Sequence, residues 1–134
     1  MAAVAAYLDT SALVKLVIRE AESEALRRAL RQWPRRVSSE LAVVELLRVA
    51  RRQPDPVRVE ANALRILAGL FLHPISRATL LRAACIEPSG LRSLDAMHLA
   101  SALELDPAIA TFVAYDVRLQ QAATTVGLHV HAPM

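Results

Sequence analysis

The chain has 134 residues, of which 54% are hydrophobic, and a net charge of +3 at pH 7. This length suits a single domain, predicted to span residues 1–134, that buries about two-thirds of its unfolded surface. No apolar run approaches the roughly 20 residues of a transmembrane helix, so we expect no membrane association. The start lacks a basic region and predicts no signal peptide. The single cysteine, Cys85, excludes an internal disulfide, favours the cytoplasm and is expected to be a buried, unreactive thiol.

The basic residues are almost all arginine, fifteen against one lysine. Arginine binds phosphate with two parallel hydrogen bonds and stacks on bases, so this balance permits binding to nucleic acid. Codon bias in a GC-rich genome explains the same excess without any such function. The chain has only two Phe, two Tyr and one Trp, which argues against an aromatic platform for stacking bases.

Short apolar segments alternate with helical segments along the chain. The segments predicted as strands are residues 4–8, 36–38, 72–75, 110–115 and 128–131. The segments predicted as helices are residues 11–18, 20–32, 39–52, 57–70, 77–86, 93–105 and 116–126. Hydroxyl side chains are expected to cap three of these helices, namely Thr10 or Ser11, then Ser39 and Ser93. The alternation predicts an α/β fold of three layers, a central parallel sheet of about five short strands between two layers of helices.

Four acidic residues lie in or beside strongly hydrophobic segments: Asp9, Glu45, Asp95 and Asp116. A carboxylate in such surroundings loses hydration and needs a partner. Asp9 and Asp116 follow predicted strands, at the edge of the sheet where open α/β folds bind ligands. Asp95 lies in the first turn of its helix, whereas Glu45 lies about two turns into its own and must reach the edge through its longer side chain.

Four carboxylates at one edge predict a shared cation. Carboxylate oxygens suit Mg²⁺ or Mn²⁺, and no spacing of Cys and His offers a zinc site. The predicted ligands are Asp9, Asp95 and Asp116, with Glu45 binding directly or through a water. Taken singly, each acid has a plainer explanation. The three aspartates can serve only as acids at helix N-termini, and Glu45 can pair with Arg48 one turn later.

Three polar residues are candidates for supporting roles. Ser11 can hydrogen-bond Asp9 or a metal-bound water, or can only cap its helix. His98 lies one turn after Asp95 on the same helix face, where it either supports the acids or packs in the core. Arg118 either contacts a phosphate or merely flanks Asp116. Glu40 is a weaker fifth acid, explained as the first-turn acid of its helix.

Four sequence blocks together resemble the PIN-domain superfamily, and within it the small VapC-like ribonuclease toxins of type II toxin–antitoxin pairs. In chain order these blocks are residues 7–15 (YLDTSALVK), 38–48 (SSELAVVELLR), 94–102 (LDAMHLASA) and 115–119 (YDVRL). Each block is weak alone, but all four occur in the family's order and each retains its acid. The segment from about residue 54 to residue 89 carries no motif.

The resemblance implies a Mg²⁺-dependent endoribonuclease in which a metal-activated water hydrolyses RNA. The residues that match the family's acidic site are the same four carboxylates. The resemblance also implies a homodimer and a cognate VapB-like antitoxin whose C-terminal segment lies in a groove. Apolar residues of the first helices, Leu13, Leu16 and Val17, are candidates to line that groove. Whether the RNA is tRNA, ribosomal RNA or mRNA is not encoded in a recognisable motif.

Other functions remain open at this stage. A PIN nuclease can process RNA without being a toxin, and a PIN-like module can bind RNA or protein without catalysis. A receiver domain needs a lysine near its fifth strand, but the only lysine is Lys15. A haloacid-dehalogenase-like phosphatase needs a second Asp two residues after Asp9, where this chain has Ser11.

Overall fold

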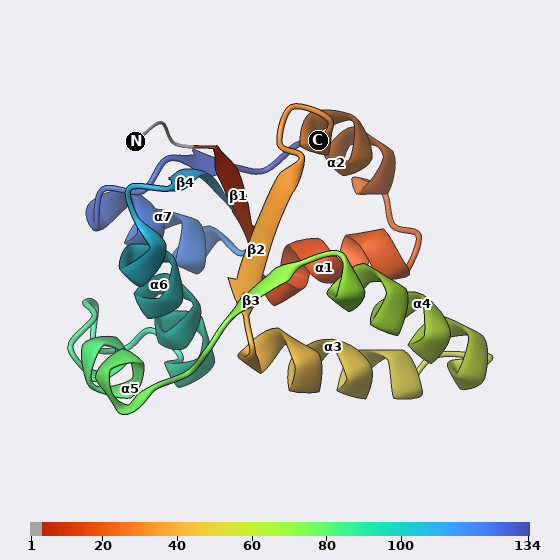
Figure 1. Cartoon of the computed structure of the whole chain (residues 1–134), viewed down its shortest axis with the longest axis horizontal. Helices are drawn as coiled ribbons and strands as arrows, with labels where there is room; N and C mark the ends of the chain where they lie inside the picture. Colours follow the sequence, from red (N-terminus) through yellow and green to blue (C-terminus); the bar gives the residue numbers. More distant parts are fainter. Residues whose placement is uncertain (1–3) are drawn as a thin grey trace.

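A computed structural model describes residues 4–134, and its centre is one sheet of parallel strands in the order β3-β2-β1-β4-β5 (Figure 1). The strands are β1 (Ala5–Leu8), β2 (Arg35–Ser39), β3 (Phe71–His73), β4 (Ile109–Val113) and β5 (Val130–His131). All five predicted strands are therefore confirmed, with boundaries that shift by a few residues. The predicted domain also includes residues 1–3, which lie outside the described residues.

Helices cover both faces of the sheet, which confirms the three-layer α/β/α prediction (Figure 1). The helices on one face are α1 (Thr10–Val17), α2 (Ser23–Leu30), α3 (Leu41–Arg51) and α4 (Pro56–Ala68). The helices on the other face are α6 (Ser93–Leu105) and α7 (Val117–Thr125), with α5 (Arg77–Ala84) packed against α6. None of these helices in the described chain is long and apolar enough to cross a membrane.

The middle strand, β1, contributes to two hydrophobic cores. Successive side chains of a strand point to opposite faces. Accordingly, Ala6 and Leu8 pack with α1–α4, whereas Ala5 and Tyr7 pack with α6 and α7. Because both faces are covered, every residue of β1 is buried, and the strand reads as a continuous apolar run.

The predicted helix caps were wrong in position. Asp9, and neither Thr10 nor Ser11, is the N-cap of α1, and its side chain accepts the Ala12 N–H. Ser39 is the last residue of β2, although its hydroxyl still accepts the Leu41 N–H at 3.1 Å. Ser93 is the first residue of α6 and follows the N-cap residue Arg92. The exact residue at which extended backbone turns into helix depends on where the strands end, which propensity alone does not specify.

Two expectations about exposure were also wrong. Cys85 is exposed, because α5 turns Thr79 and Ala83 inward and Cys85 follows at its C-terminal end. Leu13 is fully buried, and Leu16 and Val17 pack against the same core. Leu13 therefore does not line a groove, whereas Leu16 and Val17 are only partly buried and Val17 also borders a cavity of about 470 Å³.

The burial of β1 predicts a large loss of stability on truncation. We expect Leu8→Ala to lower the free energy of unfolding by about 2–5 kcal/mol, because Leu8 is fully buried and the chain cannot collapse into the cavity. Leu81→Ala, at a leucine of α5 that is 62% exposed, should change it by no more than about 0.5 kcal/mol. Urea unfolding followed by circular dichroism measures both values. Similar losses in the two variants would contradict the assignment of the core.

Candidate active site

Two of the four predicted acids lie where neighbouring strands end. Asp9 follows β1 and caps α1, and Asp116 follows β4 by three residues and caps α7. The strand order reverses at β1, since the chain continues to β2 on one side and β4 pairs on the other. Such a switch point at the carboxyl ends of strands is the usual ligand site of an open α/β sheet.

Hydrogen bonds hold the buried carboxyl group of Asp9 in place. Its side chain is buried, and Oδ1 accepts hydrogen bonds from the Ser11 hydroxyl at 2.7 Å and the Ala12 N–H at 3.0 Å. The Ser11 hydroxyl in turn accepts the Tyr115 N–H at 3.1 Å. Ser11 therefore connects the end of β1 with the segment that follows β4, which is a role in positioning the acid.

Burial changes the acidity of Asp9. Loss of hydration raises the pKa of Asp9 to about 6, and the nearby charge of Asp95 acts in the same direction. The hydrogen bonds from Ser11 and Ala12 oppose the shift, because they stabilise the ionised form. A cation beside Asp9 would oppose this shift, because its positive charge stabilises the ionised carboxylate.

Glu45 reaches the same edge from α3 and meets His98 of α6. Glu45 Oε1 accepts hydrogen bonds from His98 Nε2 at 2.8 Å and from the Thr10 hydroxyl at 2.5 Å. Partial burial acts to raise the pKa of Glu45, but these two hydrogen bonds outweigh it and lower the pKa below the usual value. Behind them, the Tyr7 hydroxyl and His98 Nδ1 form a buried hydrogen bond of 2.8 Å. The His98 ring is therefore buried in the core and also hydrogen-bonds Glu45.

Asp95 and Asp116 share one arginine that the sequence analysis missed. Arg92 Nε donates to Asp95 Oδ2 at 3.1 Å, and its Nη2 lies 3.5 Å from Asp116 Oδ2. The two carboxylates raise the pKa of Arg92, which keeps the guanidinium charged. The Arg92 side chain is nevertheless 73% exposed, so the bridge lies in water and is weak. The sequence does offer one indication of this bridge, because Arg92 precedes Asp95 by three residues at the start of a helix, a spacing that allows an ion pair.

A small cavity of about 180 Å³ opens beside this bridge. It is lined by Gly90, Leu91, Arg92, Asp95, Asp116 and Arg118. Arg118 therefore lies on the wall of the acidic site, in the first turn of α7, instead of only flanking Asp116 in sequence. No ion pair of Arg118 is present among the described residues, so its guanidinium is available to an anion.

Three of the four carboxylates share one pattern of hydrogen bonding, and Asp116 differs. In Asp9, Glu45 and Asp95, one oxygen is bound and the other accepts no hydrogen bond from any described residue. In Asp116, Oδ1 accepts the Leu119 N–H at 3.0 Å, and only the exposed Arg92 approaches Oδ2. Each acid is therefore held in place, and Asp9, Glu45 and Asp95 keep an oxygen free of hydrogen bonds with the described residues.

This donor set fits a hard divalent cation in its chemistry, since free carboxylate oxygens are the ligands that Mg²⁺ and Mn²⁺ prefer. As the side chains stand, however, no three Asp, Glu, His or Cys residues within 4–134 form a cluster that could hold a metal ion. Arg92 compensates the charge of two of the acids instead. The predicted metal ligands thus remain a prediction.

Two plainer explanations are settled by the contacts. Glu40 Oε1 accepts the Ile75 N–H at 3.1 Å, which joins the end of β2 to the loop after β3 and gives this acid a structural role. Glu45 hydrogen-bonds His98, and no Glu45–Arg48 pair occurs in the described chain.

Comparison with known proteins places the chain in a family. The model of the PIN domain matches residues 6–124, which contain all four acids. The chain belongs to the PIN-domain family. This PIN domain is 44% identical to ribonuclease VapC46 of Mycobacterium tuberculosis over 129 residues, 96% of this chain and 98% of VapC46. It is 40% identical to ribonuclease VapC47 of the same species over 131 residues, 95% of this chain and 96% of VapC47. The family resemblance to VapC proteins is thereby confirmed.

Solved structures show the same fold at lower identity. The VapBC2 complex of Rickettsia felis, bound to a DNA fragment of its promoter, contains a chain that matches with a TM-score of 0.76 and 14% identity. That match covers 97% of this PIN domain and 99% of the other chain. VapC20 of M. tuberculosis, a toxin that cleaves the sarcin–ricin loop, matches with a TM-score of 0.74 and 16% identity over 96% and 99% of the two chains.

The raised pKa of Asp9 predicts a pH-dependent stability in EDTA. Below about pH 4, Asp9 is protonated in both the folded and the unfolded state. As the pH rises to about 6, the unfolded chain ionises first, so Asp9 lowers the free energy of unfolding by about 3 kcal/mol, the equivalent of the shift from 3.8 to about 6. Asp9→Asn lacks this penalty and keeps an oxygen for the Ala12 N–H.

We therefore expect the stability of Asp9→Asn relative to the wild type to rise between pH 4 and pH 7, and to be constant above that. Urea unfolding of both proteins in EDTA measures the difference at each pH, and other titrating groups cancel in the comparison. A difference that does not change with pH would contradict the raised pKa.

Proposed function

We propose that this PIN domain is a Mg²⁺-dependent endoribonuclease and the toxin of a toxin–antitoxin pair. The observation that carries the proposal is the set of four carboxylates, from four separate elements, each held by hydrogen bonds. Three of them keep an oxygen free of hydrogen bonds with the described residues, and Asp116 Oδ2 is met only by the exposed Arg92. The relatives named ribonuclease VapC match at 40–44% identity over nearly the whole chain, which supports the reaction and the role together.

The chain's own residues divide the work as follows. Asp9, Asp95 and Asp116 would bind Mg²⁺, with Mn²⁺ as a substitute, and Glu45 would bind it directly or through a water. When bound, the cation supplies a water of lowered pKa and stabilises negative charge on the phosphate. His98 and Thr10 hold Glu45 in its ionised form, and Ser11 fixes the orientation of Asp9. The Arg118 side chain, on the cavity wall, attracts the RNA phosphate.

The proposed partners follow from the same relatives. We expect a VapB-like antitoxin, in line with the VapBC2 complex, whose chain shares this fold. An RNA substrate, a homodimer and a location in the cytoplasm remain predictions. The choice among tRNA, ribosomal RNA and mRNA requires the cleavage experiment below.

We expect Asp95→Asn to lower RNA cleavage by about 100-fold or more, because it removes a charge that the bound cation needs and keeps the shape of the side chain. The measurement is cleavage of a mixed pool of tRNA and ribosomal RNA by the wild type and the variant, with Mg²⁺ and with EDTA. Glu24→Gln, at an exposed acid of α2 outside the site, is the matched control and should cleave like the wild type.

The outcomes separate the alternatives. An identical fragment pattern from the wild type and Asp95→Asn would assign the activity to a contaminant. No cleavage, together with no binding of Mg²⁺ or Mn²⁺ in calorimetry, would leave a binding module without catalysis. Cleavage without growth arrest on expression would indicate an RNA-processing nuclease that is not a toxin.

The position of Arg92 predicts an effect on the affinity for metal. Since its guanidinium pairs with Asp95 and Asp116, it competes with a cation for these carboxylates. Each exposed ion pair is worth about 0.2–1 kcal/mol, so Arg92→Gln should tighten Mn²⁺ binding in the absence of RNA by about three- to tenfold. Calorimetric titration measures this change. Arg65→Gln, at an exposed arginine of α4, controls for net charge and should bind like the wild type. Weaker binding in Arg92→Gln would show that the bridge does not compete with the metal.

A further inference from the structure

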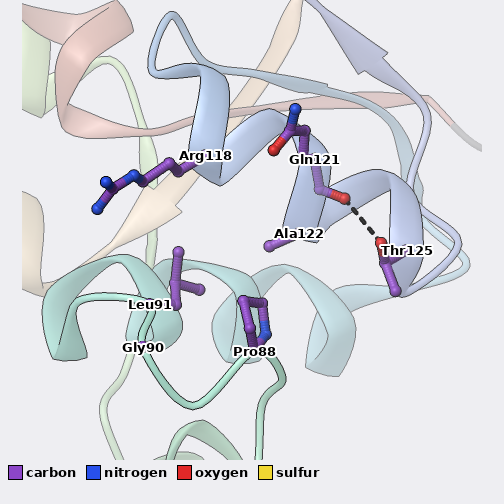
Figure 2. A pocket seen from close by; sticks show the side chains of 7 residues that line it. All are labelled: Pro88, Gly90, Leu91, Arg118, Gln121, Ala122 and Thr125. Carbon is purple, nitrogen blue, oxygen red and sulfur yellow. Dashed lines mark hydrogen bonds between the residues drawn. The ribbon is translucent and has the colours of Figure 1, made fainter.

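A second cavity lies beside the acidic one, and nothing above assigns it a role. Its volume is about 460 Å³. Figure 2 shows Pro88 and Leu91, from the loop before α6, on one side and Ala122 of α7 on the other. We call this cavity the side slot. Its walls are apolar and open to solvent, so a flat apolar group entering it would lose contact with water on both faces.

The side slot is continuous with the acidic site. Gly90, Leu91 and Arg118 line both cavities. Arg118 therefore stands between two of the carboxylates, Asp95 and Asp116, and the apolar walls, with a planar cation that can bind a phosphate or stack on a ring. A ligand that places a phosphate at the acids and a flat group in the side slot would contact Arg118 in both ways.

Polar groups are arranged along one face of α7 at the slot. Arg118, Gln121 and Thr125 are spaced at three and four residues, so they form a row about 10 Å long that starts two residues after Asp116. The Gln121 side-chain amide forms no hydrogen bond with any described residue, and the Thr125 hydroxyl donates to the Gln121 carbonyl at 2.9 Å (Figure 2). The exposed amide offers both a donor and an acceptor at the rim, the pair that the edge of a base requires.

We propose that the side slot binds the base of the nucleotide next to the scissile phosphate and so sets a sequence preference. The inference rests on the proposed ribonuclease function and adds the specificity site to it. The base stacks between the aliphatic walls and Arg118, which replaces the aromatic side chains that this chain lacks, and Gln121 contacts its edge. A protein segment also fits apolar walls. Unlike a nucleotide, however, it does not carry a flat ring and a phosphate that contact Arg118 together.

Two threonines of α7 provide a matched test. Thr125 lines the side slot and Thr124 does not, although both are exposed and both donate to the carbonyl four residues earlier. Thr125→Trp fills the slot from the end away from the acids, whereas Thr124→Trp adds the same ring outside it. Thermal unfolding shows whether both variants remain folded. Each protein then cleaves a randomised single-stranded RNA pool, and sequencing of the ends gives the base preference around each cut.

We expect a preference for one base beside the cut in the wild type and in Thr124→Trp. In Thr125→Trp this preference should be lost, and cleavage of the preferred sequence should fall about tenfold, mainly through KM. An unchanged preference in Thr125→Trp, or no preference at these positions in the wild type, would overturn the proposal. So would unchanged cleavage by Thr125→Trp together with loss of inhibition by a co-expressed antitoxin, which would assign the slot to a protein segment.

A second readout keeps this test independent of catalysis. Titration of AMP, CMP, GMP and UMP into the wild type, followed by nuclear magnetic resonance, should shift the Leu91 and Ala122 signals for at least one nucleotide. Thr125→Trp should abolish these shifts, and Thr124→Trp should retain them. Nucleotide binding without any RNA cleavage would refute the ribonuclease function and keep the slot. If no nucleotide shifts these signals, the slot is not a base site.

Discussion

The arrangement of the acidic site depends on a buried carboxylate at the end of the central strand. Asp9 ends β1, begins α1 and joins the segment after β4 through Ser11. A buried charge without compensation is strongly unfavourable, so the surrounding contacts must either supply hydrogen bonds or allow protonation. Both occur here, since Oδ1 is fully hydrogen-bonded and the pKa of the group is raised to about 6. The fold tolerates this residue because the edge of the sheet gives it backbone donors at a helix N-terminus.

The other acids are distributed so that their charges are balanced by different means. Glu45 is paired with His98 and Thr10 in a partly buried network that continues to Tyr7. Asp95 and Asp116 rely on Arg92, whose side chain is mostly exposed. The site thus has a rigid half beneath the strands and an adjustable half at the surface.

The sequence predicted the arrangement of strands well, because β1 and β4 are apolar on both faces and helices of clear period lie between them. It also predicted that Asp9 and Asp116 would follow two strands of one parallel sheet, and these strands, β1 and β4, are neighbours. It failed where the outcome depends on three-dimensional contacts. Nothing local in the sequence shows that Arg92 turns toward Asp116, a residue 24 positions away, or that His98 meets Glu45 across 53 positions. The exposure of Cys85 was missed for the same reason, because only the packing of α5 decides which of its sides is inward.

Arg92 also affects how strongly an arginine of another molecule can bind the acids. A guanidinium brought by a second molecule finds Asp95 and Asp116 already occupied by an arginine of the chain itself. The incoming arginine therefore adds to the affinity only the difference between its own ion pairs and those of Arg92 that it replaces. This difference is smaller than the free energy of a new ion pair. A tight inhibitor of this site must gain its free energy elsewhere, from apolar contacts or from a better-enclosed geometry. Because of Arg92, a positively charged partner does not bind this site tightly through its charge alone.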